Sequence, residues 1–229
     1  MQLYDGLPLL TAQPVPADKA QAPHRLYGAL AIDDICTAVR WRDMALTEIE
    51  KAVAEKKLPI VVGGTGFYIR TLTDGISPIP EVPADIRAQM VARQKELGNP
   101  AFHAELKKQD PETAEKIDPF NTQRVIRAAE VLQATGKGLA AWQKTPPVPP
   151  PRHLRFIRIA LMPPREELYA RCDQRFSEML DQGALQEAAS FQKKISLQSN
   201  TATIPLTKIS LAKIPLAKAL GFQIGRAHV

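Results

Sequence analysis

Three segments of the sequence carry residue types that could hold phosphate groups. In the first, three glycines surround Thr65 directly after the apolar run LPIVV at 58–62, in the order Gly63, Gly64, Thr65, Gly66. Glycines let backbone N–H groups approach a phosphate closely, and the start of a following helix adds partial positive charge. The segment is not a Walker A loop, because no GxxxxGK[ST] pattern occurs in the sequence. This spacing is compatible with phosphate binding and also with a plain tight turn.

The second segment is QRVIR at 123–127, which the apolar spacing places on a predicted helix. Gln123 and Arg127 are four residues apart and share one helix face, whereas Val125 lies on a different, apolar face. The planar carboxamide of Gln123 and the planar guanidinium of Arg127 are suited to bidentate contacts with phosphates or base edges. The alternative is a solvated face on which Arg127 pairs with Glu130.

A third candidate is the helix expected over 164–180. It places Arg171 and Arg175 four residues apart, on one face. These two arginines could grip a diphosphate, or they could pair with Glu167 and Asp173.

The composition excludes several classes of protein. The 229 residues suffice for one domain with an insertion, or for two small domains, at roughly 100–200 residues per domain. Apolar residues make up 45% and charged residues 24%, which excludes a collagen, a coiled coil and a fully disordered chain. The longest apolar stretch, 58–69, is interrupted by proline and glycine and is too short for a membrane helix. Residues 1–6 lack the basic start of a signal peptide, so we expect a cytoplasmic protein.

Charge and cysteine usage say little about the function of the protein. The chain has 30 Lys and Arg against 24 Asp and Glu, which gives a net charge of +6 and a pI near 9.4. A basic chain permits an anionic partner without naming one. Cys36 and Cys172 lie outside any Cys-x-x-Cys pattern or Cys/His cluster, so neither a disulfide framework nor a zinc site is indicated.

The order of predicted elements indicates an α/β core. A helix over 43–57 is followed by the β-branched run 58–62, the glycine turn and an apolar helix over 67–72. This order is typical of an open parallel sheet, with the glycine turn at the carboxyl end of a strand. Further strands are expected at 24–31 and at 154–161.

A helical insertion interrupts this core. Helices are expected over 84–97, 101–108, 111–117 and 122–135, with Asp110 and Asn121 as N-caps. The insertion ends in the proline-rich connector TPPVPPP, at 145–151. The C-terminal segment departs from this plan, because IPLTK at 204–208 is nearly repeated as IPLAK at 214–218. We interpret the repeat as a local duplication or a sequence error. We predict a non-native tail at 224–229, since IGRAHV can be back-translated to a common sequencing-library adapter.

The motifs and their order resemble those of bacterial tRNA dimethylallyltransferases, also called IPP transferases. The matching segments include MQLYDGL, PHRLYG, LPIVVGGTGFYIRTLTDG, DPETAEKI, QRVIRAAEVLQATGK and RCDQRFSEMLDQGAL. They cover residues 1 to about 185 and resume at 214–222. The resemblance implies a P-loop-NTPase-like open parallel sheet with a helical insertion domain that contacts tRNA.

The resemblance also implies an activity. Members transfer a dimethylallyl group from dimethylallyl diphosphate to N6 of the adenosine 3′ of the anticodon, in tRNAs that read codons starting with U. The base is flipped into the site, an Asp acts as general base, and Mg²⁺ and cationic groups hold the leaving diphosphate. The implied partners are tRNA and dimethylallyl diphosphate, with no membrane, and the protein is expected to be a monomer.

Site residues carry over from the family only where the motifs match. The implied tRNA-binding residues are Met1, Gln2, Thr65, Arg87, Gln123, Arg124, Val125, Ile126 and Arg127. The implied diphosphate-binding residues are Arg175, Gly63 and Gly64. No catalytic residue or metal ligand is assigned within the chain, because the family's P-loop and general-base Asp would precede Met1.

The departures lead us to predict a fragment that is inactive by itself. The family's Gly-Thr-Ala-Lys-Pro reads Leu-Thr-Ala-Gln-Pro here, with Gln13 in place of the lysine, and the family's C-terminal region is missing. We expect 1–86 to be the first part of the α/β core, 87–148 the insertion, 149–223 the return to the core and 224–229 the tail. Two other classes remain open: a P-loop-type small-molecule kinase and a non-catalytic basic RNA-binding module.

Overall fold

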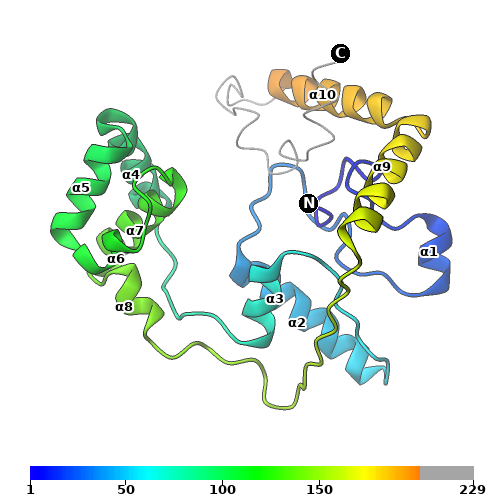
Figure 1. The fold of residues 1–229 in the computed structure, drawn as a ribbon, viewed down its shortest axis with the longest axis horizontal. Coiled ribbons are helices and arrows are strands. Elements are labelled where there is room, and N and C mark those ends of the chain that lie inside the picture. Colours follow the sequence, from blue (N-terminus) through cyan, green and yellow to red (C-terminus); the bar gives the residue numbers. More distant parts are fainter. Residues whose placement is uncertain (202–229) are drawn as a thin grey trace. The chain divides into compact units, whose positions relative to one another are not determined.

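The computed structural model describes residues 1–201, and the side chains of residues 1–195 (Figure 1). The duplicated segment 204–218 and the predicted tail at 224–229 lie outside the described residues. The helices of the described range are α1 (Pro16–Gln21), α2 (Ala38–Ala54), α3 (Gly66–Thr73), α4 (Ala84–Leu97), α5 (Asn99–Gln109), α6 (Pro111–Glu115), α7 (Thr122–Thr135), α8 (Leu139–Gln143), α9 (Arg165–Asp181) and α10 (Ala184–Thr201). None of these described helices is long and apolar enough to cross a bilayer.

The chain divides into two compact units. The first unit consists of residues 1–61 together with the chain from 157 onward, and the second consists of residues 62–156. We call the second the helical unit, because it contains α3 to α8.

The predicted parallel sheet is not found among residues 1–201. The segments 58–62 and 154–161 are extended but form no ladder, and their apolar side chains are exposed, as in Ile60 at 77% and Ile159 at 83%. Of the strand expected at 24–31, only Leu30 pairs, in an isolated parallel bridge with Tyr4. A parallel strand is stable only between neighbouring strands, and the described residues supply none for these runs.

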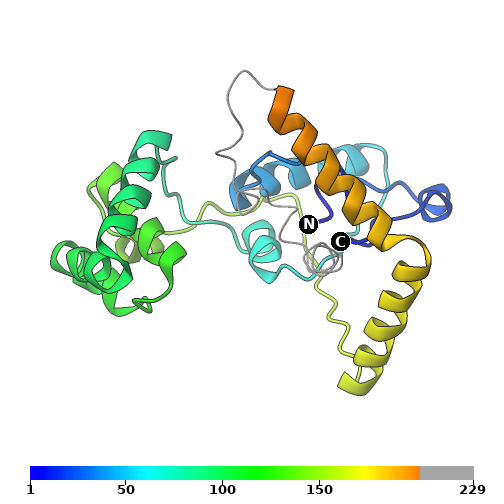
Figure 2. The same cartoon turned by 90° about the horizontal axis from the view of Figure 1, so that it is seen from above.

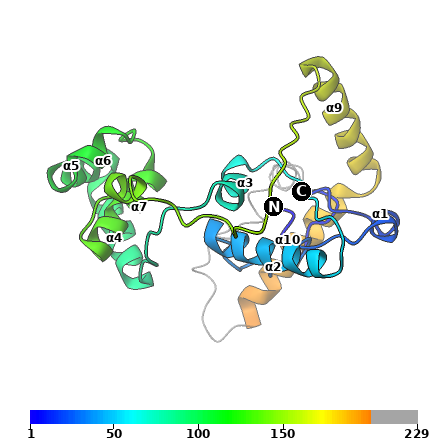
Figure 3. The ribbon, with the colours of Figure 1, turned by 90° about the horizontal axis from the view of Figure 1, so that it is seen from below.

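The helical unit has its own small core, and its helices α4 to α8 form a bundle (Figure 3). The buried residues of that core are Phe102, Leu106, Ala114, Ile117, Val125, Ala128 and Ala129. The bounds predicted for α4 and α7 are confirmed. Both predicted N-caps are confirmed as well, because the Asp110 carboxylate accepts a bond from the Thr113 N–H and the Asn121 side chain accepts one from the Arg124 N–H.

The proline-rich connector is hydrogen-bonded to the segment before α4 through Val148, the single non-proline residue at 146–151. Val148 is the only residue of PPVPPP with a backbone N–H, and that N–H donates to the Ile76 carbonyl at 2.8 Å. The Ile76 N–H donates back to the Val148 carbonyl at 3.3 Å, which makes an antiparallel bridge. The segment that leads into α4 and the segment that follows α8 are thereby joined.

We expect Gly75→Ala to weaken this junction. Gly75 has φ +93°, and a Cβ there would overlap the Val148 carbonyl, which is backbone and cannot rotate away. The free energy of unfolding should fall by roughly 1–3 kcal/mol in a urea titration. The matched control is Gly98→Ala, because Gly98 also has a positive φ but open space around its Cα. If the two variants lose equal stability, overlap with Val148 contributes nothing.

An exposed ion-pair cluster ties α6 to the end of α8. The Glu112 carboxylate lies 2.8 Å from the ammonium of Lys116 and 2.8 Å from that of Lys144. Hydrogen bonds from these two lysines lower the pKa of Glu112 from 4.5 to about 2. Because the folded-state pKa is lowered, the stabilisation is fully present above pH 4.5 and is lost as the pH falls toward 2.

We therefore expect Glu112→Gln to lower the melting temperature slightly at pH 7 and to have no effect at pH 2. The shift should be small, since all three side chains are solvent-exposed and screened. Melting curves followed by circular dichroism between pH 2 and 7 measure it. Glu115→Gln removes the same charge from the same helix without touching either lysine pair. A pH-independent difference between wild type and Glu112→Gln would contradict the assignment.

The first unit packs its N-terminal segment against α10. Its buried cluster comprises Tyr4, Leu7, Leu30, Ile32, Ala188 and Phe191. The Glu187 carboxylate accepts hydrogen bonds from the Leu9 and Leu10 N–H groups, each at 2.9 Å, and so holds the loop that follows Leu7. Helices α9 and α10 are separated by a bend in the chain (Figure 2). Gly183, which lies in this bend, has φ +98°.

Candidate functional site

Helix α7 presents the predicted tRNA-contacting segment 123–127 with two different faces. Gln123 and Arg124 are exposed, and Ile126 and Arg127 are half-buried. Val125 is completely buried in the core of the helical unit, so its side chain anchors the helix there. Its predicted contact with tRNA, like those of its neighbours, stays a prediction.

Arg127 and Arg87 meet at one carboxylate, that of Glu130. The Arg127 Nη1 donates to Glu130 Oε1 at 2.7 Å, and the Arg87 Nη1 lies 3.4 Å from both Glu130 oxygens. The Glu130 side chain is 0% exposed, whereas those of Arg87 and Arg127 are 66% and 42% exposed. The structure therefore places two cationic side chains, one from α4 and one from α7, together at the surface of the helical unit.

The sequence pattern predicted only one of the two arginine contacts of Glu130. The i,i+3 spacing indicated the pair Arg127–Glu130, which the structure contains. It did not indicate Arg87, which is 43 residues from Glu130 in sequence. Only the packing of α4 against α7 brings that guanidinium to the same carboxylate.

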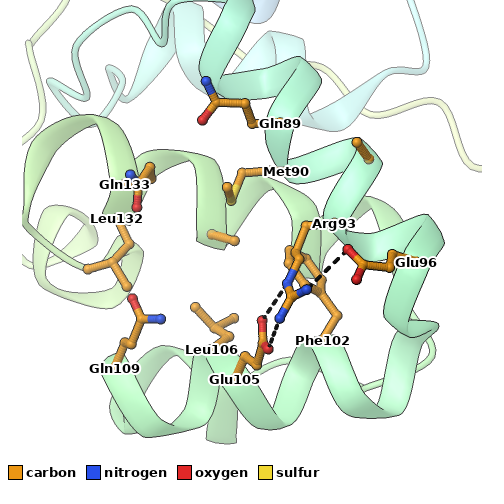
Figure 4. Close-up of a pocket in the computed structure, with 12 residues that line it drawn as sticks. Gln89, Met90, Arg93, Glu96, Phe102, Glu105, Leu106, Gln109, Leu132 and Gln133 are labelled. Carbon is orange, nitrogen blue, oxygen red and sulfur yellow. Dashed lines mark hydrogen bonds and ion pairs between the residues drawn. The ribbon is translucent and has the colours of Figure 1, made fainter.

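A different arginine of α4 is neutralised within the helical unit. The Arg93 guanidinium bonds the Glu105 carboxylate at 2.6 Å and the Glu96 carboxylate at 3.1 Å (Figure 4). These residues line a cavity of about 500 Å³ among α4, α5 and α7, together with Phe102 and Leu106. Since two carboxylates already surround Arg93, this cavity is a poor site for an anionic ligand.

The glycine segment is exposed in the structure and leads into α3. Gly63 and Gly64 have open space around them, and Thr65 precedes α3 without a side-chain capping bond. The Thr65 carbonyl accepts a bond from the Ile69 N–H, so the residue does begin the helix. The predicted contacts of this segment with tRNA and diphosphate remain predictions.

Two glutamine side chains stabilise the N-terminal segment of the first unit by hydrogen bonds to backbone carbonyls of the same segment. The Gln2 side chain donates to the Ala12 carbonyl at 2.7 Å, and the Gln13 side chain donates to the Tyr4 carbonyl at 2.9 Å. Gln13, which replaces the lysine of the resembled pattern, thus acts as a structural donor. Met1 is exposed at 47%.

Two of the three arginines of α9, Arg171 and Arg175, differ in their surroundings. Arg171 pairs with Glu167 one turn earlier, as one alternative from the sequence predicted. Arg175 is exposed, and among the described residues the structure gives it no hydrogen bond or ion pair. The donors of Arg175 are therefore available to an anionic ligand.

Comparison with curated proteins points to one family. A model of the family described as IPP transferase matches residues 2–223. A protein named tRNA dimethylallyltransferase from Rhodospirillum centenum is 50% identical over 187 residues, which cover 82% of this chain and 60% of that protein. One of the same name from Paramagnetospirillum magneticum is 44% identical and is matched by all of this chain over 68% of its own length. The chain thus spans only about three-fifths to two-thirds of these relatives.

Solved structures agree with the fold. A crystal structure of a eukaryotic dimethylallyltransferase acting on tRNA superposes with a TM-score of 0.73 at 23% identity, over 99% of this chain and 60% of that one. The tRNA isopentenylpyrophosphate transferase of Bacillus halodurans gives a TM-score of 0.51 at 25% identity, over 99% and 72%. With the family match over 2–223, these findings show that the chain belongs to the IPP transferase family.

Proposed function

We propose that this protein is a tRNA dimethylallyltransferase of the cytoplasm. It takes the dimethylallyl group of dimethylallyl diphosphate and transfers it to N6 of the adenosine 3′ of the anticodon, in tRNAs that read codons starting with U. Within the structure, the observation that carries this proposal is the pair of exposed guanidiniums of Arg87 and Arg127 on the helical unit. Two neighbouring guanidiniums are suited to binding RNA phosphates. The proposal is also supported by the relatives of this chain, which are named tRNA dimethylallyltransferase.

The helical unit is proposed as the tRNA-binding part. Gln123 and Arg124 extend its polar surface beside Arg127, since they are exposed on the same helix. Phosphate contacts from such a surface position an RNA without reading its sequence. Met1, Gln2 and Thr65 are proposed as further tRNA contacts outside this helix.

Arg175 is proposed as a diphosphate-binding residue of the first unit. Gly63 and Gly64 are proposed, separately, to offer backbone N–H groups to a phosphate. In the reaction the N6 lone pair forms a bond to the allylic carbon, the carbon–oxygen bond to the diphosphate breaks, and N6 loses a proton. Negative charge grows on the leaving diphosphate, so fixed cationic groups there lower the barrier most. Arg175 supports this role because its charge is not neutralised among the described residues.

The Mg²⁺ that the resemblance implies is proposed as a cofactor of the intact protein, and none of the described residues is assigned as its ligand. Those residues contain no group of three His, Cys, Asp or Glu that could hold a metal ion. Loss of activity on chelation stays a prediction for the intact protein, in which one carboxylate and the substrate phosphates could suffice for Mg²⁺.

The exposed apolar runs support the proposal of a sheet core in the longer protein. Segments 58–62 and 154–161 each expose β-branched residues, which a monomeric protein normally covers. We propose that they are strands of a P-loop-NTPase-like parallel sheet. Hydrogen exchange on the intact gene product tests this, because paired strands protect amides that the extended segments leave open.

The activity is tested with the intact gene product, dimethylallyl diphosphate and unmodified tRNA. Mass spectrometry of the digested nucleosides should find N6-dimethylallyladenosine only when all three are present. A small-molecule kinase would ignore tRNA, and a basic RNA-binding module would bind tRNA without consuming dimethylallyl diphosphate. Either of those results would overturn the proposed function.

A further inference from the structure

We infer that Glu130 is a positioning residue for tRNA binding, which holds the guanidiniums of Arg87 and Arg127 as one fixed anion-binding pair. The inference rests on the proposed function and adds a residue that makes no contact with the RNA itself. Glu130 is completely buried, so only its two arginine partners reach solvent.

The carboxylate is placed by the fold of the helical unit. Glu130 lies on α7 one turn after Arg127 and next to the buried residues Ala128, Ala129 and Val131. A carboxylate without solvent contact has to be paired, because an unpaired buried charge is strongly destabilising. The two arginines satisfy this requirement, and the carboxylate in turn limits their rotamers.

Each guanidinium keeps most of its donors available. An arginine carries five N–H donors in a planar fork, and Glu130 accepts from a single nitrogen, Nη1, of each arginine. Among the described residues the structure gives Arg87 and Arg127 no other side-chain partner. Because both Nη1 atoms approach Oε1 of Glu130, the two guanidiniums are held close together and can bind neighbouring phosphate oxygens.

Arg93 shows what a purely structural arginine of the same helix looks like. It bonds the carboxylates of Glu96 and Glu105, whose side chains are 67% and 38% exposed. Two negative charges around one arginine leave no net positive charge, whereas one buried carboxylate between two arginines leaves a net charge of about +1 at the surface. The arrangement at Glu130 therefore attracts an anion and the arrangement at Arg93 does not.

Glu130→Gln separates positioning from simple electrostatics. The change removes a negative charge from a basic surface, so charge alone predicts tighter binding of tRNA. Positioning predicts weaker binding, because a neutral amide holds the two guanidiniums poorly and they must be ordered when the RNA binds. Fluorescence anisotropy with a labelled anticodon stem-loop, over a series of KCl concentrations, measures the dissociation constant of the full chain. We expect it to rise about 5- to 20-fold for Glu130→Gln.

Three further variants test whether the loss of affinity is specific to the contact between Glu130 and its two arginines. Glu105→Gln removes the same charge from the Arg93 cluster and should not weaken binding. In an Arg87→Ala, Arg127→Ala background, Glu130→Gln should cause no additional loss, because Glu130 acts only through these arginines. Replacing both arginines with lysine keeps the charges and leaves Glu130 in place, yet should also weaken binding about 5- to 20-fold, since lysine lacks the planar fork.

The lysine variant keeps the inference testable if Glu130→Gln fails to fold, as judged by circular dichroism. Equal or tighter binding by Glu130→Gln, or full affinity in the lysine variant, would overturn the positioning role while leaving the proposed function intact. If the wild-type chain shows no affinity for the stem-loop, the tRNA-binding proposal and the role of Glu130 both fail.

Discussion

Replacing Phe102 with alanine is expected to unfold the helical unit. Phe102 is 3% exposed and is the only aromatic residue in the buried cluster of that unit, most of whose other members are alanine, valine or leucine. Truncation of a buried phenylalanine costs about 3–5 kcal/mol, through lost burial and the cavity left behind. A core this small has few other contacts to compensate, and domains are stable by only about 5–15 kcal/mol.

The measurement is urea denaturation followed by circular dichroism at 222 nm, together with limited proteolysis of the helical unit. Phe120→Ala is the matched control, because Phe120 is 74% exposed in the same unit and should cost less than about 0.5 kcal/mol. The Phe102 variant should also lose affinity for tRNA, since α4 and α7 no longer hold Arg87 and Arg127 together. Equal stability of the two phenylalanine variants would show that the cluster around Phe102 is not the core of the unit.

Arg175→Ala is expected to lower kcat/KM for dimethylallyl diphosphate about 100-fold in the intact protein. Loss of one donor that stabilises developing negative charge typically lowers the rate by about 10²–10³. Arg175 is exposed on α9 without a described partner, so its charge is available to a leaving diphosphate. The affinity for tRNA should stay unchanged, because α9 is not part of the proposed tRNA-binding unit.

Arg171→Ala provides the comparison on the same helix. Arg171 is one turn away and already paired with Glu167, so its removal should change kcat/KM much less than removal of Arg175. Initial rates with varied dimethylallyl diphosphate at saturating tRNA distinguish the two variants. If both arginines contribute equally, the helix acts through its total charge and Arg175 has no individual role.

The sequence alone predicted most of the helical unit. The bounds of α4 and α7 and the caps Asp110 and Asn121 were all predicted correctly. These features depend on residues within a few positions of one another, which is the range over which helix periodicity and capping operate. Family membership was also predicted from the sequence, because the order of many short motifs is itself a property of the chain.

The sheet could not be predicted in the same way. The run at 58–62 has the apolar, β-branched composition of a buried strand, yet its side chains are exposed in the structure. A helix satisfies its hydrogen bonds within one segment, whereas a strand needs neighbours from elsewhere in the chain. Composition therefore indicated which runs could pair but not whether a partner strand is present.

What the sequence by itself determined about this protein is its family, its local helices and the identity of its exposed arginines. Only the tertiary structure decided which of those arginines act together. Arg87 and Glu130 are 43 residues apart, and the sole N–H of PPVPPP finds its acceptor at Ile76 on a distant segment. Such contacts arise because packing removes side chains and backbone groups from water and forces them to find partners across the fold, which no short-range pattern records.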